Sequence, residues 1–215
     1  MSDTYPAFPK IPRFHRQVTI TEKIDGTNGL IEVRRWDAAN TAAAVPGVNF
    51  VTTPDGVYTV RAGSRNRWLA PGADNHGFAA WVAGNATELV KLGEGNHYGE
   101  WYGKGIQRGY NRADKAFALF NVGRWYDPRH DEPDPRTPKA RPCPEVVTVV
   151  PVLWIGNAYE LNNAITASLA VLHQHGSIIE AGFMNPEGVI VFHEASRTTF
   201  KVLIEGDERP KGAAA

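Results

Sequence analysis

The chain has 215 residues, of which 42% are hydrophobic and 21% charged, as is typical of a globular protein with a sizeable core. Its 23 basic and 23 acidic residues give a formal net charge of zero. A protein that held nucleic acid by bulk charge alone would be basic, so a polyanionic partner must be met by a local patch. The one cysteine, Cys143, excludes a disulfide framework and a cysteine-based four-ligand zinc site.

The sequence shows no sign of export or membrane insertion. Its N-terminal residues contain no apolar core of signal-peptide length, and no stretch approaches 18 apolar residues. The composition, rich in alanine, glycine and proline, is typical of a GC-rich source genome. We therefore expect a cytoplasmic protein without a membrane partner, encoded by a bacterium or a phage.

The first part of the chain predicts an extended arm followed by strands. Residues 1–16 are rich in proline and predict a lead-in. Alternating apolar residues predict strands at 17–24 and 29–36, and Asp25-Gly26 between them predicts a β-hairpin turn. The following segments predict a long surface loop at 37–56, a short strand within it at 48–51, and a strand at 57–65.

The middle of the chain predicts a helix, two strands and a connection. Apolar residues at helical spacing predict a helix over 76–93, broken near Gly84. Aromatic-rich runs predict strands at 97–103 and 116–127. Six prolines and alternating charges over 127–145 predict a mobile connection.

The last third predicts a strand interrupted by Pro151 at 146–156, and then a helix at 159–176 that ends in glycine. Two more strands are predicted at 187–195 and 197–207. Together these elements predict an α+β fold that is rich in antiparallel strands and has two covering helices. The predicted domain occupies residues 17–207, and 208–215 form a tail.

A lysine, Lys23, lies two positions before the predicted turn. A lysine nucleophile must lose its proton, and with a reference pKa near 10.4 only about one lysine in two to three thousand is neutral at pH 7. Burial or a nearby cation lowers the pKa of a lysine. A nucleophilic lysine should therefore have cationic groups and metal-binding carboxylates close to it.

Distant segments supply groups of these kinds. Arg65 has serine and asparagine beside it and suits a phosphate or a ribose, and Lys201 lies in the last predicted strand. Glu100 and Glu187 lie at strand positions with glycines nearby, which would let a ligand come close. Two carboxylates plus substrate phosphates suit Mg²⁺. Two lysines and an arginine suit a triphosphate.

The segment Lys23-Ile24-Asp25-Gly26 resembles motif I (KxDG) of the covalent nucleotidyltransferases, the superfamily of ATP-dependent DNA and RNA ligases and mRNA capping enzymes. The strings TEKIDGTN and GEWYGKGIQ are most similar to the RNA ligase 2 branch. Five further motifs follow in the order of the family: SR at 64–65, GE at 99–100, an aromatic motif at 117–121, EG at 187–188 and a lysine at 201. The resemblance spans residues 17 to about 207.

This resemblance implies an ATP-grasp-like nucleotidyltransferase domain. Ligases of the superfamily commonly append an OB-fold or a helical domain, and we expect no appended OB-fold or C-terminal domain here, because the sequence ends soon after Lys201. Lys23 would attack the α-phosphate of ATP in the presence of Mg²⁺ (or Mn²⁺) and form a lysyl-AMP. The AMP would pass to the 5′-phosphate of a nucleic acid, and a 3′-hydroxyl would displace it to seal RNA. The partner would be RNA ends or a nicked duplex, with a separate substrate-binding protein as a further possibility.

The resemblance also implies a role for each site residue. Lys201 would neutralise the α-phosphate, Phe120 would stack on adenine, and Arg65 would contact ribose or phosphate. Glu22 and Asn28 would orient the nucleotide. The metal would be held by Glu187 and Glu100, and Glu100 would alternatively bind the ribose.

The chain departs from the family pattern in motif V, which usually has two lysines as KxK. Here Thr199 or Leu203 occupies the second position. Three other functions stay open: a DNA-nick ligase, a GTP-dependent capping guanylyltransferase and a non-catalytic nucleic-acid-binding domain. Arg108, after the third motif, either contacts a substrate phosphate or lies on a solvated loop.

Overall fold

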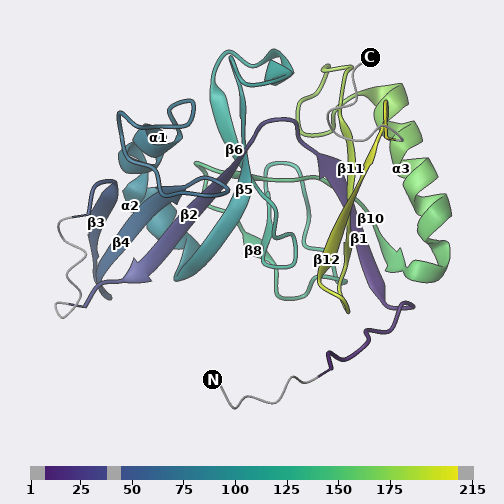
Figure 1. Cartoon of the computed structure of the whole chain (residues 1–215), viewed down its shortest axis with the longest axis horizontal. Coiled ribbons are helices and arrows are strands. Elements are labelled where there is room, and N and C mark those ends of the chain that lie inside the picture. The colour runs from purple at the N-terminus through teal and green to yellow at the C-terminus, as the bar shows by residue number, and fades with distance from the viewer. Residues whose placement is uncertain (1–7, 38–44, 208–215) are drawn as a thin grey trace.

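The computed structural model describes residues 8–37 and 45–207. The first seven residues of the predicted lead-in, part of the predicted loop and the whole predicted tail at 208–215 lie outside the described residues. Two sheets lie side by side, each covered by helices on one face (Figure 1). The predicted α+β fold with mainly antiparallel strands is confirmed.

Sheet A contains four antiparallel strands and is covered by one long helix, at the right of Figure 1. Its strands, in spatial order, are β10 (Val152–Asn157), β1 (Gln17–Lys23), β11 (Gly188–His193) and β12 (Thr198–Leu203). The helix is α3 (Leu161–His175), which follows the short helix η4 (Ala158–Glu160).

Sheet B contains six strands. In spatial order they are β3 (Val48–Thr53), β4 (Gly56–Gly63), β2 (Thr27–Arg35), β5 (Gly95–Gly103), β6 (Lys115–Leu119) and β9 (Thr148–Val149). The helices α1 (Phe78–Gly84), α2 (Ala86–Leu89) and η2 (Val90–Leu92) belong to this half, and η3 (Gly109–Asn111) follows β5. A small ribbon pairs β7 (Trp125–Tyr126) with β8 (Arg141–Pro142).

Alternation along the strands decides which face of each sheet is buried. In β1, Val18 and Ile20 pack against Leu172 of α3 and are fully buried. In β2, Ile31 and Val33 enter the core that contains α1 and α2. Burial of each such side chain contributes about 1.5–3 kcal/mol. Alternate residues therefore point to the opposite face of each sheet, and we call these the open faces.

The predicted β-hairpin at Asp25-Gly26 is wrong, because β1 and β2 belong to different sheets. Residues 24–26 instead carry the chain across from sheet A to sheet B (Figure 1). Two-residue hairpin turns need positive φ angles, and neither Asp25 nor Gly26 has one. Gly26 is needed for close packing: a Cβ there would lie 2.5 Å from the carbonyl oxygen of Trp101 on β5.

A second crossing occurs at Pro151, where the predicted interruption is confirmed. β9 pairs with β6 in sheet B, and β10 pairs with β1 in sheet A. The amide of Val150 donates to the carbonyl oxygen of Leu119 in sheet B (3.0 Å). The carbonyl oxygen of the next residue, Pro151, accepts from the amide of Glu22 in sheet A (3.0 Å). The two crossing segments thus join the sheets at one place.

Four other predictions about elements have different outcomes. The helix break at Gly84 and the strand within the predicted loop are confirmed by α1, α2 and β3. The strand predicted over 116–127 is too long, because β6 ends at Leu119 and the chain turns before β7. The predicted connection at 127–145 folds back to form β8. Among the described residues, no helix is both long and apolar enough to cross a membrane.

Candidate active site

Lys23 is the last residue of β1, at the point where the chain leaves sheet A for sheet B. It pairs with Gly188, the first residue of β11, so Glu187 lies beside it. The Lys23 ammonium donates to the Glu187 carboxylate in a short ion pair, and the two side chains are only 21% and 16% exposed. Motifs 164 residues apart thus meet through strand pairing.

Gly188 has to be glycine for this pairing. Its φ is +152°, and a Cβ at this position would lie 2.2 Å from the carbonyl oxygen of Val202 on β12. A larger residue would push β11 and β12 apart and move Glu187 away from Lys23. The glycine in the EG motif therefore has a packing role.

Glu100 lies near Lys23 and Glu187 but belongs to sheet B. It lies on the open face of β5, opposite Asn28 of β2, and its carboxylate accepts a hydrogen bond from the amide of Gly26 (3.2 Å). Burial raises the pKa of Glu100 to about 7, although the nearby positive charge of Lys23 opposes this. Charge repulsion from Glu187 and Asp25 raises it further, which places all of these groups close together.

The raised pKa of Glu100 predicts a pH-dependent stability. The folded protein binds a proton on the Glu100 carboxylate more tightly than the unfolded chain does, where the pKa of a glutamate is 4.5. The contribution of Glu100 to the free energy of unfolding therefore falls as the pH rises from about 4.5 to about 7. The loss is at most about 3 kcal/mol. Glu100→Gln should remove it, so the variant should gain stability over the wild type at pH 8 and not at pH 4.5. Urea unfolding in metal-free buffer measures the free energy of unfolding of the wild type and of Glu100→Gln at each pH. The same difference between the two proteins at pH 4.5 and pH 8 would contradict the prediction.

Asp25 is fixed by the loop that follows β5. Its amide donates to the hydroxyl of Tyr110 (2.8 Å), and its carboxylate accepts from Arg108 Nε (3.0 Å). Arg108 also donates to the carbonyl oxygen (2.9 Å) and the side-chain oxygen (2.7 Å) of Asn185, just before Glu187. Arg108 therefore ties the segment after Lys23 to the segment before Glu187. Neither sequence interpretation of Arg108, a phosphate contact or a solvated loop, included this role.

We predict that Arg108→Ala slows lysyl-AMP formation roughly 10- to 100-fold, because Lys23 and Glu187 lose their common support and small displacements of reacting groups are costly. Lys104→Ala is the matched control, since Lys104 is an exposed cation on the same loop. The measurement is the single-turnover rate of protein labelling by ATP. Equal rates in the two variants would show that Arg108 does not position the site.

Glu22 is arranged differently from Lys23. It points to the opposite face of β1 and is 1% exposed, and its carboxylate accepts hydrogen bonds from the Ser177 hydroxyl (2.6 Å) and the amides of Ile178 (2.8 Å) and Ile179 (3.1 Å). Burial raises the pKa of Glu22 despite these bonds. A direct contact with the nucleotide would require these bonds to be broken, so the geometry favours a positioning role.

The Glu22 hydrogen bonds continue into sheet B. Ser177 Oγ also accepts from the amide of Glu180 (3.2 Å), and the Glu180 carboxylate accepts from the hydroxyl of Tyr102 on β5 (2.8 Å) and pairs with Arg112. This buried network links β1 to β5 near the crossing segments. No pattern in the single sequence signals it, because the three segments that it joins, around residues 22, 102–112 and 177–180, are linked by hydrogen bonds between residues 68 to 155 positions apart.

Lys201 lies on the same open face as Lys23. Strand pairing aligns Thr21, Ile190 and Lys201 across β1, β11 and β12, and it aligns Lys23, Gly188 and Leu203 two residues further on. Because directly opposite residues point to the same face, Leu203 occupies the place in register with Lys23. Of the two positions considered for the second motif V lysine, the structure therefore puts Leu203 nearest the nucleophile.

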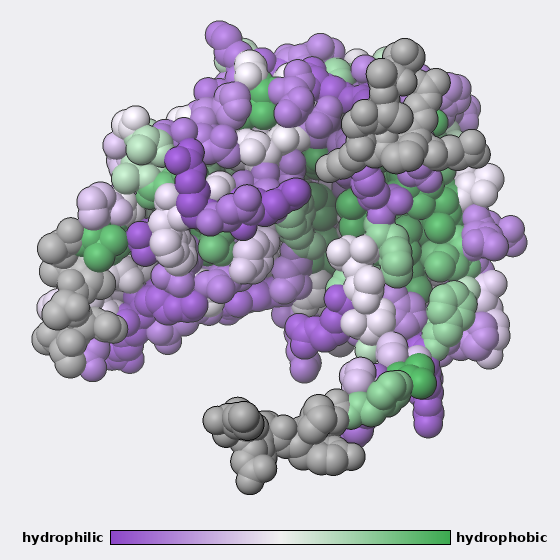
Figure 2. Space-filling model, in the orientation of Figure 1, coloured by the Kyte–Doolittle hydropathy of each residue, from purple (hydrophilic) through white to green (hydrophobic). Residues whose placement is uncertain are grey.

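Two of the remaining predicted residues, Asn28 and Phe120, lie on the open face of sheet B. Asn28 is opposite Glu100, and Phe120, which is 40% exposed, follows β6. Arg65 is exposed just after β4. The surface is hollowed between the halves that contain the two sheets (Figure 2). The structure thus gathers Lys23, Glu187 and Glu100 closely and places Lys201, Asn28 and Phe120 on the open faces around them. It places Glu22 on the opposite face of β1.

The carboxylates fit a magnesium ion that is also bound by substrate. Repulsion from the nearby Glu187 carboxylate helps to raise the pKa of Glu100, so the two carboxylates lie near each other, and carboxylate oxygens are preferred ligands of Mg²⁺. Within residues 8–37 and 45–207, no group of three or more acidic, histidine or cysteine side chains could hold a metal ion by itself. Phosphate oxygens would therefore have to complete the coordination.

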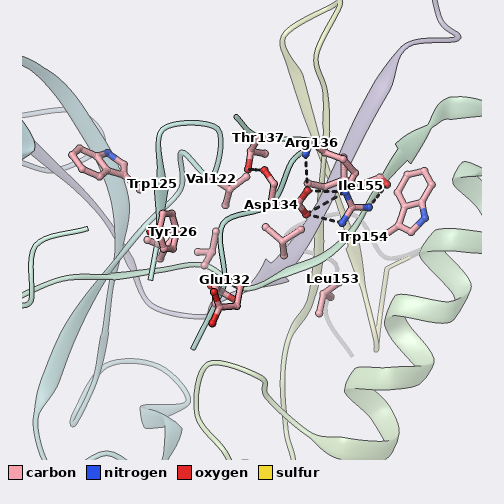
Figure 3. A pocket seen from close by; sticks show the side chains of 14 residues that line it. Val122, Trp125, Tyr126, Glu132, Asp134, Arg136, Thr137, Leu153, Trp154 and Ile155 are labelled. Atoms are coloured by element: carbon pink, nitrogen blue, oxygen red, sulfur yellow. Dashed lines mark hydrogen bonds and ion pairs between the residues drawn. The ribbon is translucent and has the colours of Figure 1, made fainter. Parts of the chain in front are cut away.

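A cavity of about 220 Å³ lies elsewhere, between the segment after β6 and strand β10 (Figure 3). Arg136 spans part of its wall, with an ion pair to Asp134 (2.6 Å) and a hydrogen bond to the carbonyl oxygen of Ile155 (2.8 Å). None of the predicted nucleotide-binding residues lines this cavity. We assign it no part in the candidate site.

Comparisons with known proteins identify the family of the chain and proteins of similar fold. The family model described as RNA ligase matches residues 16–203. An archaeal ATP-dependent RNA ligase is similar in structure, with a TM-score of 0.51, 14% identity, and 90% of this chain and 47% of that chain covered. A Naegleria gruberi RNA ligase with ATP and Mn has a TM-score of 0.48, 17% identity, and coverage of 89% and 50%.

The chain spans about half the length of these solved structures, and none of the curated proteins compared with it matches. The low identities limit the structural likeness to the fold. The family model, in contrast, covers most of the chain, including every motif from Lys23 to Lys201. The chain therefore belongs to the RNA ligase family.

Proposed function

We propose that this chain carries the adenylation chemistry of an ATP-dependent RNA ligase that joins 3′-hydroxyl and 5′-phosphate ends. The observation that carries the proposal is the contact between Lys23 and Glu187 at the junction of the two sheets, with Glu100 approaching from sheet B. A half-buried lysine between two carboxylates, bordered by an open face that carries Lys201, suits attack on a nucleotide phosphate.

In the first step the Lys23 amine forms a bond to the α-phosphorus of ATP, and the bond from that phosphorus to the bridging oxygen of pyrophosphate breaks. Glu187, which contacts Nζ, is placed to accept the proton that the ammonium group must lose. Lys201 and Arg65 would stabilise the charge on the phosphates. Mg²⁺, held by Glu187 and Glu100 with phosphate oxygens, would neutralise charge on the triphosphate.

In the second step an RNA 5′-phosphate oxygen attacks the lysyl-AMP phosphorus, and the bond between Nζ and phosphorus breaks. In the third step a 3′-hydroxyl attacks the 5′-phosphorus of the adenylylated RNA, and AMP leaves. Lys23 is a nucleophile only in the first step and regains a proton after the second. Asn28 and Phe120 would hold the adenosine throughout, on the face they share with Glu100.

One observation favours a second candidate, a non-catalytic nucleic-acid-binding domain. Leu203 lies in register with Lys23, where the family pattern has a second cationic residue. Loss of that charge would weaken catalysis more than binding. The two candidates differ in whether the protein becomes covalently labelled.

The test combines labelling with sealing. The protein is incubated with α-labelled ATP or GTP and Mg²⁺ and analysed under denaturing conditions, and is then assayed on single-stranded RNA ends, nicked RNA, nicked DNA and hybrid duplexes. We expect label from ATP and sealing of RNA. Label from GTP alone would indicate a guanylyltransferase, sealing restricted to DNA would indicate a DNA-nick ligase, and binding without label would favour the non-catalytic domain.

A further inference from the structure

Three large aromatic side chains are exposed on the open face of sheet B or at its edge. Trp68 is 42% exposed, Tyr98 is 50% exposed and Phe120 is 40% exposed. Side chains of this size usually bury most of their surface, and clustered exposed apolar groups mark binding sites. Phe120 has an expected partner in adenine, but the other two have none in the chemistry described above.

Strand pairing places these side chains in one row across the sheet. The Phe120 amide donates to the carbonyl of Tyr98 (3.0 Å), and Tyr98 is paired with Leu30. Leu30 is paired with Gly63, and Gly63 forms a bridge with Trp68. Directly paired residues lie side by side on one face of a sheet. We call Phe120, Tyr98, Leu30 and Trp68 the aromatic row.

Gly63 makes the row continuous. A Cβ at this position would lie 3.3 Å from Leu30 Cδ2 and 3.4 Å from a ring carbon of Trp68. The indole ring therefore lies over the bare backbone of Gly63, next to Leu30. The result is an apolar surface that crosses sheet B from β6 to the segment after β4.

The aromatic row lies directly beside the candidate active site. Glu100 and Asn28 form the neighbouring pair on the same face, two residues along β5 from Tyr98, or about 7 Å. The row thus begins at the residue expected to stack on adenine and continues away from Lys23. A polynucleotide whose end reacts near Lys23 has this surface within reach.

The charges around Trp68 suit phosphates. Arg61 lies over the indole ring, with its guanidinium carbon 4.2 Å from the ring centroid, and its Nε has no hydrogen-bond partner among the described residues. Arg65 and Arg67 are exposed on the segment between Gly63 and Trp68. Residues 57–73 contain no acidic side chain. The acidic residue paired with Arg61, Glu32 of β2, forms an ion pair with Arg34. Aromatic rings interleaved with arginines are the surface that single-stranded nucleic acids use.

From this arrangement we infer that the aromatic row binds unpaired nucleotides of the RNA substrate, with bases stacked on Tyr98 and Trp68 and phosphates near Arg61. The inference rests on the proposed function and adds a substrate class to it. A base inside a duplex has both faces covered by its neighbours, whereas an unpaired base can stack on an aromatic side chain. The substrate is therefore single-stranded near one of the ends that are joined.

The experiment measures binding of a fluorescent single-stranded RNA by anisotropy, without ATP, to the full chain and its variants. Tyr98→Ala and Trp68→Ala should each weaken binding about 5- to 150-fold. Tyr98→Phe keeps the ring and should bind nearly as the wild type does. Phe50→Ala is the matched control, since Phe50 is 44% exposed on β3 and is paired with Thr59, four residue pairs along β4 from Gly63. RNA should also quench tryptophan fluorescence in the wild type and less in Trp68→Phe.

Wild-type affinity in both alanine variants would overturn the inference, as would an equal loss in Phe50→Ala. Tighter binding of a blunt RNA duplex than of single-stranded RNA would also overturn it. Lysyl-AMP formation is measured separately in the absence of RNA. If the wild type forms no lysyl-AMP, the proposed function is contradicted. If the wild type forms lysyl-AMP but the variants bind RNA as the wild type does, only the proposed role of the aromatic row in RNA binding is contradicted.

Discussion

Replacing Lys23 with alanine is expected to reduce lysyl-AMP formation at least a thousandfold, because the reaction then has no nucleophile. Lys201 cannot take over, since it lies on β12, separated from β1 by β11. The measurement is the single-turnover rate of labelling by α-labelled ATP. Sealing of RNA from ATP should be lost to the same extent.

Two controls separate chemistry from folding in this experiment. Lys23→Arg keeps a cation beside Glu187 but has no amine that can become a nucleophile at neutral pH, so it should be equally inactive. RNA that already carries the 5′-adenylyl group bypasses the first two steps, and Lys23→Ala should still seal it. Labelling of Lys23→Ala at the wild-type rate would contradict the assignment of the nucleophile.

The second large effect is expected for Glu187→Ala, which should slow lysyl-AMP formation about 100- to 1,000-fold. The substitution removes the carboxylate that contacts Lys23, which is also one of the two carboxylates proposed to hold Mg²⁺. A higher Mg²⁺ concentration should therefore restore part of the rate. The measurement is the labelling rate as a function of Mg²⁺ concentration.

Glu194→Ala is the matched control for Glu187→Ala. Glu194 follows the other end of β11, where it accepts a hydrogen bond from Gln17 (3.0 Å), far along the strand from Lys23. This variant should keep the Mg²⁺ dependence of the wild type. If Glu187→Ala also kept it, Glu187 would have no part in holding the metal.

The residues that the structure brings together at the junction of the two sheets were predictable as a candidate site because short strings of sequence carry them. Lys23, Glu100 and Glu187 each lie beside a glycine or within a few residues of one, and the structure gives Gly26 and Gly188 a clear steric reason. Alternation along the strands also predicted antiparallel sheets with one covered face. These signals are local, so they can be recognised in the sequence without any knowledge of the tertiary structure.

The relation between the two sheets was not predictable in the same way. Asp25-Gly26 is a local signal for a hairpin, but packing of Gly26 on β5 overrides it and sends the chain into the second sheet. Arg108 forms hydrogen bonds with Asp25 and Asn185, which are 83 and 77 residues away in the sequence. The aromatic row depends on the register of four strands. Such contacts are set by topology, and no window of a single sequence contains them.

The most direct test of the account is to locate the covalent bond to AMP. The protein is incubated with ATP and Mg²⁺, digested under conditions that preserve a phosphorus–nitrogen bond, and analysed by mass spectrometry. We expect a single AMP on the peptide that contains Lys23, released when RNA with a 5′-phosphate is added. Absence of any adduct, or an adduct on Lys201 instead, would contradict the account.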